Sequence, residues 1–463
     1  MQETPHDDVN TSRRRLSGIA AVISFRPLRA LAALLPLNAL ASGKTDYRTY
    51  DYSKPIPAHD YAFSDFSGKL APLDFKRRAL ADDDVAIDIH YCGICHSDVH
   101  TGLGHWAREQ KVPQVTGHEI AGLVTAVGKN VTKFKVGDRV GVGCFVDSCG
   151  HCRECRGGHE QYCETPGGAV FAYGQPTSEA RDPGGYTQGG YSDVIVVKDR
   201  FVIRIPDAMP LAVAAPIMCS AVTACSPLVN WKVGKGSKVG VVGMGGVGHN
   251  AVQLATAMGA DVTVFTTSPE KIEDAKRVGA REVILNFDPD AITRHFRHFD
   301  FILATVPYQF EMDGVLSTLK REGTLCLIGV GDFEKPNQIN VLTTSLNRVN
   351  FSGSLVGSVK EMQEVIDYCA ANNIQAAIEL VKPEDISQRW QDVIAKKARY
   401  RYVIDMGKGA TSSAPPGRRA SKKSSRRASP SFMRRATNRM TKPRRCWISP
   451  IPPTAKPPAS CTA

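Results

Sequence analysis

Residues 238–260 read KVGVVGMGGVGHNAVQLATAMGA and decide the fold of the second half of the chain. An apolar run precedes three spaced glycines and then apolar residues at helical spacing, which predicts a strand, a tight turn and a helix. Gly243 permits the turn, Gly245 lets the backbone approach a pyrophosphate, and Gly248 lets the helix pack on the strand. The N-terminus of that helix would face the phosphates. The predicted dinucleotide-binding loop comprises Gly243, Gly245, Gly246, Val247 and Gly248.

The segments after this loop keep alternating between strand and helix. One helical pattern begins at Pro269, and another spans about 312–320. The expected strands are 261–265, 281–286, 299–306 and 323–330. This alternation predicts a doubly wound parallel sheet.

The segments before residue 206 have a different pattern. VAIDIHY at 85–91 alternates apolar and polar residues with period two, and short strands with glycine turns continue to about Pro206. This predicts a small antiparallel barrel. A helical pattern at 359–373 and an alternating segment at 398–406 follow the parallel sheet.

A run of closely spaced cysteines lies in SCGHCRECRGGHEQYC. Two-residue gaps let consecutive thiolates turn back onto one ion, and a flexible glycine pair lets the fourth thiolate close a tetrahedron. The alternative is a pair of disulfides in an exported protein, which half-cystines three residues apart would strain. The spacing therefore predicts a structural zinc site formed by Cys149, Cys152, Cys155 and Cys163.

A second set of soft and imidazole ligands is dispersed along the chain, in CGICHSDVH, GHEIAG and APIMCS. Cys95, His118 and Cys219 could converge as three protein ligands and leave the open position that a catalytic zinc requires. Spacing alone does not decide this point, because a single cysteine or histidine is more often a buried structural residue.

Taken in order, CGICHSDVH, GHEIAGLVTAVG, VGDRVGVG, the four-cysteine run and APIMCSAVTACSPL resemble the zinc-dependent medium-chain alcohol dehydrogenases, in particular the cinnamyl-alcohol-dehydrogenase-like aldehyde reductases. The resemblance covers roughly residues 61–406. It implies a GroES-like catalytic domain at 56–220 that is completed by 355–408, and a Rossmann cofactor domain at 221–354. It also implies a homodimer or homotetramer.

The resemblance further implies roles for single residues. Cys95, His118 and Cys219 would hold the catalytic zinc, so two zinc ions per chain are expected. Ser97 and His100 match the hydroxyl-to-imidazole proton relay, and a histidine exchanges protons with solvent near neutral pH. The remaining implied roles are Glu119 near the metal, His96 facing the pyrophosphate, Asp98 steadying the zinc ligands and Trp106 walling the substrate pocket.

The residues after the second strand of the Rossmann pattern indicate which dinucleotide binds. Thr266 stands where NAD-specific members of the family keep an aspartate that would repel a 2′-phosphate. Thr267, Ser268 and Lys271 follow and offer hydroxyls and a cation, which favours NADP(H). Ser268 also fits a helix N-cap before Pro269, and Lys271 could equally be a solvated helix residue.

The net charge of +12 is concentrated at the two ends of the chain. Residues 409–463 hold 13 basic residues and no acidic one, and residues 1–45 hold six basic against three acidic. Residues 46–408 therefore carry 39 basic against 43 acidic residues, a net charge of −4. A nucleic-acid-binding fold is not expected for such a body.

The two ends lead to separate expectations. Residues 1–55 contain consecutive arginines, an apolar stretch broken by Arg26 and Pro27, and an Ala39-Leu40-Ala41 pattern, which resembles a twin-arginine leader. Export, a cytoplasmic location and a merely disordered extension stay open.

The tail at 409–463 is expected to be disordered, either as a solvated appendage or as an arm that binds nucleic acid or acidic lipid. No run reaches about 18 apolar residues, so no membrane span is expected.

The expected function is reversible hydride transfer between NADP(H) and an aromatic or medium aliphatic alcohol or aldehyde. One alternative is a polyol or aliphatic alcohol dehydrogenase with the same site. An alternative of another class is a zinc-containing binding protein that acts through its basic tail.

Overall fold

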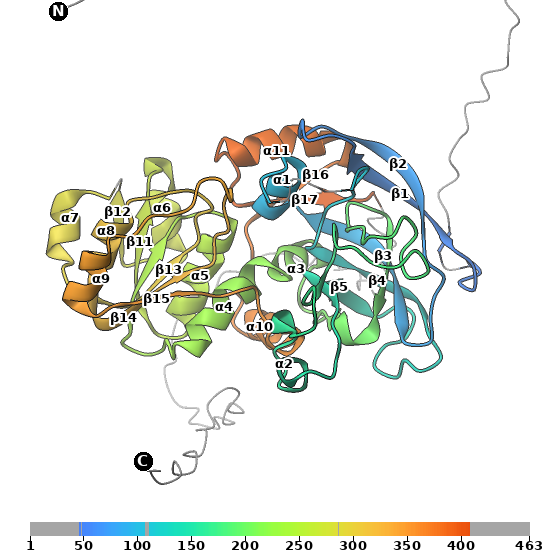
Figure 1. Cartoon of the computed structure of the whole chain (residues 1–463), viewed down its shortest axis with the longest axis horizontal. Helices are drawn as coiled ribbons and strands as arrows, with labels where there is room; N and C mark the ends of the chain where they lie inside the picture. The colour runs from blue at the N-terminus through green and yellow to red at the C-terminus, as the bar shows by residue number, and fades with distance from the viewer. Residues whose placement is uncertain (1–45, 48, 107–110, 286, 408–463) are drawn as a thin grey trace, which may run out of the picture. The chain divides into compact units, whose positions relative to one another are not determined.

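The computed structural model describes residues 46–407, except 48, 107–110 and 286 (Figure 1). The leader-like segment and the basic tail lie outside the described residues, apart from 46–55, and the predictions made for them stay predictions.

A six-stranded, fully parallel sheet forms the nucleotide-binding half of the protein. Its spatial order is β12 (Glu282–Leu285), β11 (Asp261–Thr266), β10 (Lys238–Val242), β13 (Phe299–Ala304), β14 (Leu319–Leu327) and β15 (Asn350–Gly353). The strand order reverses beside β10: β11 and β12 lie on one side of it and β13 to β15 on the other. This is the Rossmann order, with its ligand crevice at the switch point.

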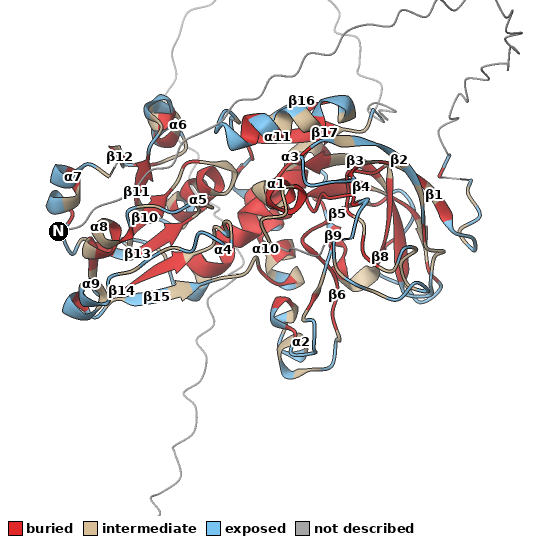
Figure 2. Ribbon diagram, turned by 45° about the horizontal axis from the view of Figure 1, so that its top comes forward, coloured by how far each residue is buried: buried red, intermediate tan, exposed pale blue. Residues whose placement is uncertain are grey.

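Six helices connect and flank these strands (Figure 1). They are α4 (Ser220–Asn230), α5 (Gly246–Ala257), α6 (Ile272–Arg277), α7 (Pro289–Arg294), α8 (Met312–Ser317) and α9 (Val341–Asn347). The central strands are buried on both faces (Figure 2). Continuous Val, Ile and Leu runs such as those of β10 and β13 therefore suit these positions.

The other half is built on a mainly antiparallel seven-stranded sheet. Its order is β16 (Ile378–Val381), β17 (Arg401–Asp405), β3 (Asp84–Gly93), β4 (Ile120–Val127), β5 (Arg139–Val142) and β9 (Ile203–Arg204), and β8 (Val194–Lys198) pairs with β3 beside this path. Two antiparallel two-stranded sheets accompany it: β1 (Ile56–Phe63) with β2 (Leu70–Arg77), and β6 (Phe145–Asp147) with β7 (Val170–Phe171). Its helices are α1 (His96–Gly102), α2 (Arg153–Arg156), α3 (Leu211–Ile217), α10 (Val359–Ala371) and α11 (Ile386–Ile394).

The last described strand returns to this first sheet. β17 pairs antiparallel with the end of β3, with Val403 opposite Gly93 and Ile404 opposite Cys92. Arg401, two residues before Val403, therefore lies next to the segment that follows β3. The predicted fold class, an α/β chain with a Rossmann half and an antiparallel half, is confirmed. The domain boundaries stay predictions.

One element boundary differs from expectation. The helical pattern at 312–320 ends as a helix at Ser317, and β14 already begins at Leu319. A register shift interrupts the pairing of β13 with β14, and Glu322 has a positive φ of 66°. Because the strand starts irregularly, the periodicity of its residues does not reveal where it begins.

In the described part of the chain, no single helix is long and apolar enough to span a membrane. The bent pair α3 and α4 passes such a test together by length and composition, but α4 is buried from Ser220 to Leu228.

Candidate active site

Three predicted zinc ligands from distant parts of the sequence meet in one buried cluster. Cys95 stands at the N-cap of α1, His118 precedes β4, and Cys219 stands at the N-cap of α4. Their ligand atoms and a carboxylate oxygen of Glu119 all lie within 4.8 Å of one another. This donor set, two thiols and one imidazole with a carboxylate beside them, fits a catalytic zinc.

The carboxylate of Asp98 contacts two of the predicted zinc ligands and fixes their orientation. Its carboxylate accepts hydrogen bonds from the backbone N–H of Cys95 (2.8 Å) and of Gly117 (3.0 Å), and from the Tyr191 hydroxyl (3.0 Å). It also lies 3.2 Å from Nδ1 of His118. This contact leaves Nε2 of His118 as the free ring nitrogen, and that atom is buried without a hydrogen-bond partner. An imidazole held in this way matches the carboxylate–histidine arrangement of zinc sites.

A buried arginine lies against the cluster. Arg401 donates from Nη1 to the Ile94 carbonyl (3.0 Å), and its Nη2 lies 3.2 Å from Oε1 of Glu119. Both carboxylate oxygens of Glu119 are buried and lack a hydrogen bond. A hydrogen bond from Cys219 and the charge of Arg401 lower the pKa of the Cys95 thiol in spite of its burial. The thiolate is the form that binds metal.

The four clustered cysteines also come together, with their sulfur atoms within 4.8 Å of one another. None of the described cysteines forms a disulfide. Backbone N–H groups donate to the sulfurs: Cys152 to Cys149 (3.3 Å) and Cys155 to Cys152 (3.4 Å). Hydrogen bonds from Thr165 and from the His151 backbone lower the pKa of Cys149 to about 5. The arrangement fits a closed tetrahedral zinc site.

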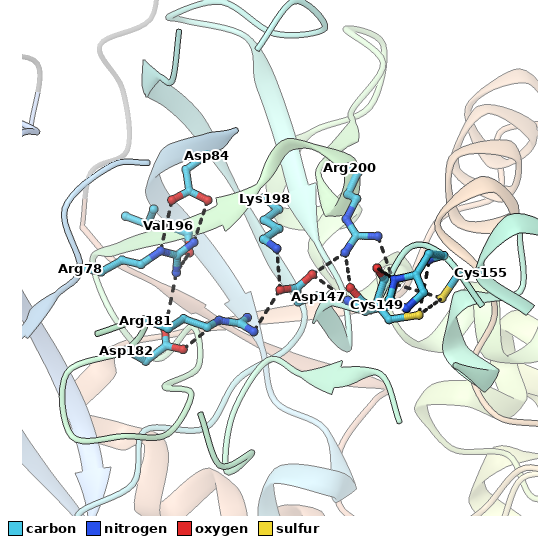
Figure 3. Close-up of polar contacts among 12 residues, drawn as sticks. Arg78, Asp84, Asp147, Cys149, Cys155, Arg181, Asp182, Val196, Lys198 and Arg200 are labelled. Carbon is cyan, nitrogen blue, oxygen red and sulfur yellow. Dashed lines mark hydrogen bonds and ion pairs between the residues drawn. The ribbon is translucent and has the colours of Figure 1, made fainter. Parts of the chain in front are cut away.

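A chain of charged side chains ties this cluster to the sheet (Figure 3). The buried Asp147 lies 2.9 Å from Lys198 Nζ and 3.0 Å from Arg181 Nη1, and it accepts from Arg200 Nη2 (2.5 Å). Arg200 also donates to the hydroxyl (3.1 Å) and to the carbonyl of Ser148. The thiol of Cys155 donates to the same hydroxyl (3.4 Å). Asp147 therefore pairs with three cations, and one of them, Arg200, also bonds to Ser148 next to the cysteine cluster.

We expect Asp147→Asn to lower the free energy of unfolding of the zinc-loaded protein by about 3 kcal/mol, because three cations lose their shared carboxylate. Burial raises the pKa of Asp147, but Lys198 and Arg181 lower it more, to a net value below the usual range. The difference between variant and wild type should thus persist above about pH 4 and shrink as the pH falls through the lowered pKa. Denaturant unfolding from about pH 2 to about pH 8 checks this. Asp82→Asn, which removes an exposed ion pair with Lys129, is the control. Equal stabilities of Asp147→Asn and wild type at pH 7 would contradict the expectation.

The glycine loop opens onto a cavity of about 370 Å³. Gly243 has a φ of +97°, and a Cβ at Gly248 would lie 2.1 Å from the Gly243 carbonyl oxygen, so both positions need glycine. A Cβ at Gly245 would meet no atom within 4 Å. The backbone there faces open space, as the close approach of a pyrophosphate requires. Gly246 and Val247 begin α5, whose N-terminus lies at the cavity.

The four residues expected at a 2′-phosphate line the same cavity: Thr266, Thr267, Ser268 and Lys271. Ser268 takes the N-cap position before Pro269, but its side chain makes no capping hydrogen bond. Lys271 is 6% exposed, so it is not a solvated helix residue. Burial, and then the charge of Arg399, lower its pKa. Its Nζ lies 5.7 Å from the centre of the Tyr400 ring.

The expected relay residues lie around α1. Ser97 lines the cavity, with Oγ 3.7 Å from the Cys95 sulfur. His96 also lines it, and its Nε2 lies 2.6 Å from the Tyr308 hydroxyl. His100 differs from expectation, because it is only 5% exposed and does not itself meet solvent freely. Trp106 stacks on His100 (5.5 Å), and its Nε1 donates to the Gly331 carbonyl (2.8 Å). Its role as a pocket wall stays a prediction.

Sequence reasoning did not find three residues of this site. Arg401, Tyr308 and Lys396 all line the cavity. Arg401 lies within an alternating segment and Tyr308 follows a strand, but a single charged or aromatic residue carries no local signal of its partners. Only the pairing of β17 with β3 brings Arg401 to Glu119.

Two family models match the chain. The alcohol dehydrogenase GroES-like domain matches residues 81–207, and the zinc-binding dehydrogenase model matches residues 246–371. The chain is 46% identical over 345 residues to NADP-dependent alcohol dehydrogenase C 1 of Mycolicibacterium smegmatis, covering 74% of this chain and 97% of that protein. It is 44% identical over 339 residues to the aldehyde reductase YahK of Escherichia coli, covering 73% and 94%.

A solved structure agrees with these relatives. The cinnamyl alcohol dehydrogenase of Sorghum bicolor aligns with a TM-score of 0.72 and 36% identity, over 77% of this chain and 99% of that one. These similarities span both halves of the described structure, the cysteine cluster and the glycine loop. The chain belongs to the zinc-dependent alcohol dehydrogenase family, as the two converging sets of ligands had indicated.

Proposed function

We propose that the protein is an NADP(H)-dependent zinc alcohol dehydrogenase that works mainly as a reductase of aromatic or medium aliphatic aldehydes. The observation that carries this proposal is the convergence of Cys95, His118 and Cys219 beside the cavity that the glycine loop lines. Relatives named as an NADP-dependent alcohol dehydrogenase and as an aldehyde reductase support it.

The two zinc ions and the dinucleotide would each have a separate binding site. Cys95, His118 and Cys219 would hold the catalytic zinc, the four clustered cysteines would hold a structural zinc, and the glycine loop would hold NADP(H). When bound, zinc polarises a carbonyl oxygen and reduced nicotinamide supplies a hydride. The buried carboxylate of Glu119, whose oxygens accept no hydrogen bond, would balance the charge of Arg401 and could enter the metal's coordination sphere during ligand exchange.

The proton needed for the product alcohol comes from this chain. Ser97 Oγ lies 3.7 Å from Cys95 Sγ and would deliver a proton to the substrate oxygen. Nε2 of His100 is buried without a partner and is the nitrogen that would replenish this proton.

A panel of aldehydes and alcohols, run with NADPH and with NADH while bound zinc is quantified, tests the proposal. We expect fastest turnover with NADPH and benzaldehyde-type substrates, and two zinc ions per chain. Preference for sugar alcohols would favour the polyol dehydrogenase. Absence of turnover in the zinc-loaded protein would contradict the enzyme assignment. Activity that survives deletion of 409–463 would argue against action through the tail.

We further propose that two copies of the chain associate through α9 and β15. β15 is the outer strand of the parallel sheet, and its free edge has no strand partner within the described residues. Large apolar side chains are exposed around it, with Leu346 68% exposed. The others are Val341, Leu342 and Phe351. An unpaired edge beside an apolar patch suits a self-complementary interface.

For this interface we expect sedimentation to give twice the mass of one chain. Leu346→Asp should raise the dissociation constant on the order of 100-fold, because it places a charge in the apolar centre of the contact. Val136→Asp, at another exposed apolar position, should leave the mass unchanged. A wild type with the mass of one chain, or a dimer that tolerates Leu346→Asp, would contradict the proposal.

A further inference from the structure

The imidazole of His100 is closed off from water. Its ring stacks on Trp106 with an interplanar angle of 16°, and the residue is 5% exposed. Its Nδ1 lies 2.8 Å from Nδ1 of His105, whereas its Nε2 is buried and has no partner. A proton that leaves His100 through Nε2 must therefore be replaced through Nδ1.

His105 is the group that meets Nδ1. It stands five residues after His100, beyond the end of α1, and its backbone N–H donates to the His100 carbonyl (2.9 Å). The two ring centres are 5.0 Å apart. His105 is partly exposed, in contrast to His100. The pair therefore leads from a buried imidazole to one that water can reach.

The pair holds a single proton between its two facing nitrogens. Burial, and then the charge of His105, lower the pKa of His100 to about 4, so His100 is neutral at neutral pH. Two Nδ1 atoms at 2.8 Å need one hydrogen between them. That hydrogen can belong to either ring.

Titratable groups from two elements face the pair. His96 on α1 has its ring 5.8 Å from that of His100, and burial lowers its pKa to about 4. From the loop after β14, Asp332 interacts electrostatically with both histidines, and Lys335 lies 3.5 Å from Asp332. Within the described part of the chain, the Cys95 thiolate is the other charge that acts on His100. Asp332 favours a proton on the exposed ring.

We propose that His105 is the solvent-facing member of a two-histidine relay that supplies His100 with the proton used in carbonyl reduction. This inference rests on the proposed function. His100 gives its Nε2 proton to Ser97 and takes the proton of His105 Nδ1, while His105 takes one proton from water at Nε2. Both rings stay neutral, and one proton passes from solvent to the product alcohol. Exchange with water between turnovers restores the starting tautomers.

The first experiment is His105→Asn, measured as aldehyde reduction by NADPH. The asparagine amide can keep a hydrogen bond to Nδ1 of His100 but cannot pass a proton. We expect kcat to fall about 100-fold with an unchanged KM for the aldehyde, an altered pH profile of kcat and an unchanged zinc content. Added imidazole should restore turnover of His105→Ala. His59→Asn, which changes a histidine on β1 paired with Asp74, should behave as wild type.

The second experiment needs no cofactor or substrate. In protein labelled with ¹⁵N-histidine, the shared Nδ1 proton should give an exchange-protected imidazole signal that disappears in His105→Ala. Unchanged kcat and pH profile in His105→Asn would overturn the relay and leave the proposed function standing. Loss of zinc, or loss of turnover in His105→Ala that imidazole does not restore, would show a structural role and also overturn it. Absence of turnover in the wild type would overturn the proposed function and the relay together.

Discussion

The Cys95→Ser variant is expected to lose at least about 1,000-fold in aldehyde reduction and to bind one zinc ion per chain instead of two. A serine hydroxyl stays protonated near neutral pH, so it cannot replace the thiolate that Arg401 stabilises beside Cys219. Loss of the metal removes several kcal/mol of stabilisation from the developing alkoxide, and each 1.4 kcal/mol is about tenfold in rate.

Steady-state kinetics with NADPH and zinc quantification check this expectation. Cys326→Ser is the matched control, because Cys326 is a fully buried thiol on β14, outside both ligand clusters. The control should keep two zinc ions and most of the activity. Turnover of Cys95→Ser at the wild-type rate, or retention of two zinc ions, would contradict the assignment of Cys95 as a ligand.

The Thr266→Asp variant is expected to lose about 100-fold in kcat/KM for NADPH and to gain for NADH. Thr266 ends β11 and is 5% exposed, and its hydroxyl accepts from the Ser268 backbone N–H (3.2 Å). A carboxylate about 5 Å from a phosphate repels it by about 3 kcal/mol per unit charge at an effective dielectric constant of about 20. The same carboxylate can accept a hydrogen bond from the free ribose hydroxyl of NADH.

Paired kinetics with the two dinucleotides measure this change. Thr266→Asn has nearly the same size as the aspartate variant and no charge, so it should keep the preference for NADPH. A Thr266→Asp variant with the wild-type ratio of the two kcat/KM values would place the 2′-phosphate away from the end of β11.

The features that the sequence could predict are local ones. The glycine loop and the four cysteines each lie within a short segment, and short-range geometry is sufficient to bring their atoms together. The parallel sheet followed from alternating strand and helix patterns. In contrast, Cys95 and Cys219 are 124 positions apart. Nothing in their spacing indicates that they meet, and only the resemblance to a family suggested it.

The residues that sequence reasoning missed are those whose partners depend on strand pairing or on loop packing. Asp147 stands in a three-residue strand, and the three cations that meet it come from positions 181, 198 and 200. Arg401 is one basic residue in an alternating strand, where either face could be buried. His105 had a weak signal, a second histidine five residues after His100, but spacing does not reveal which ring is exposed.

The position of Arg401 has a consequence for how the protein acquires its metals during synthesis. The four clustered cysteines are all present once residue 163 has left the ribosome, so that site can bind zinc early. The other cluster contains Glu119, which stays without its buried cation until Arg401 emerges much later and β17 pairs with β3. Metal loading should therefore be ordered, with the cysteine cluster filled first and the catalytic position filled only after Arg401 has been synthesised.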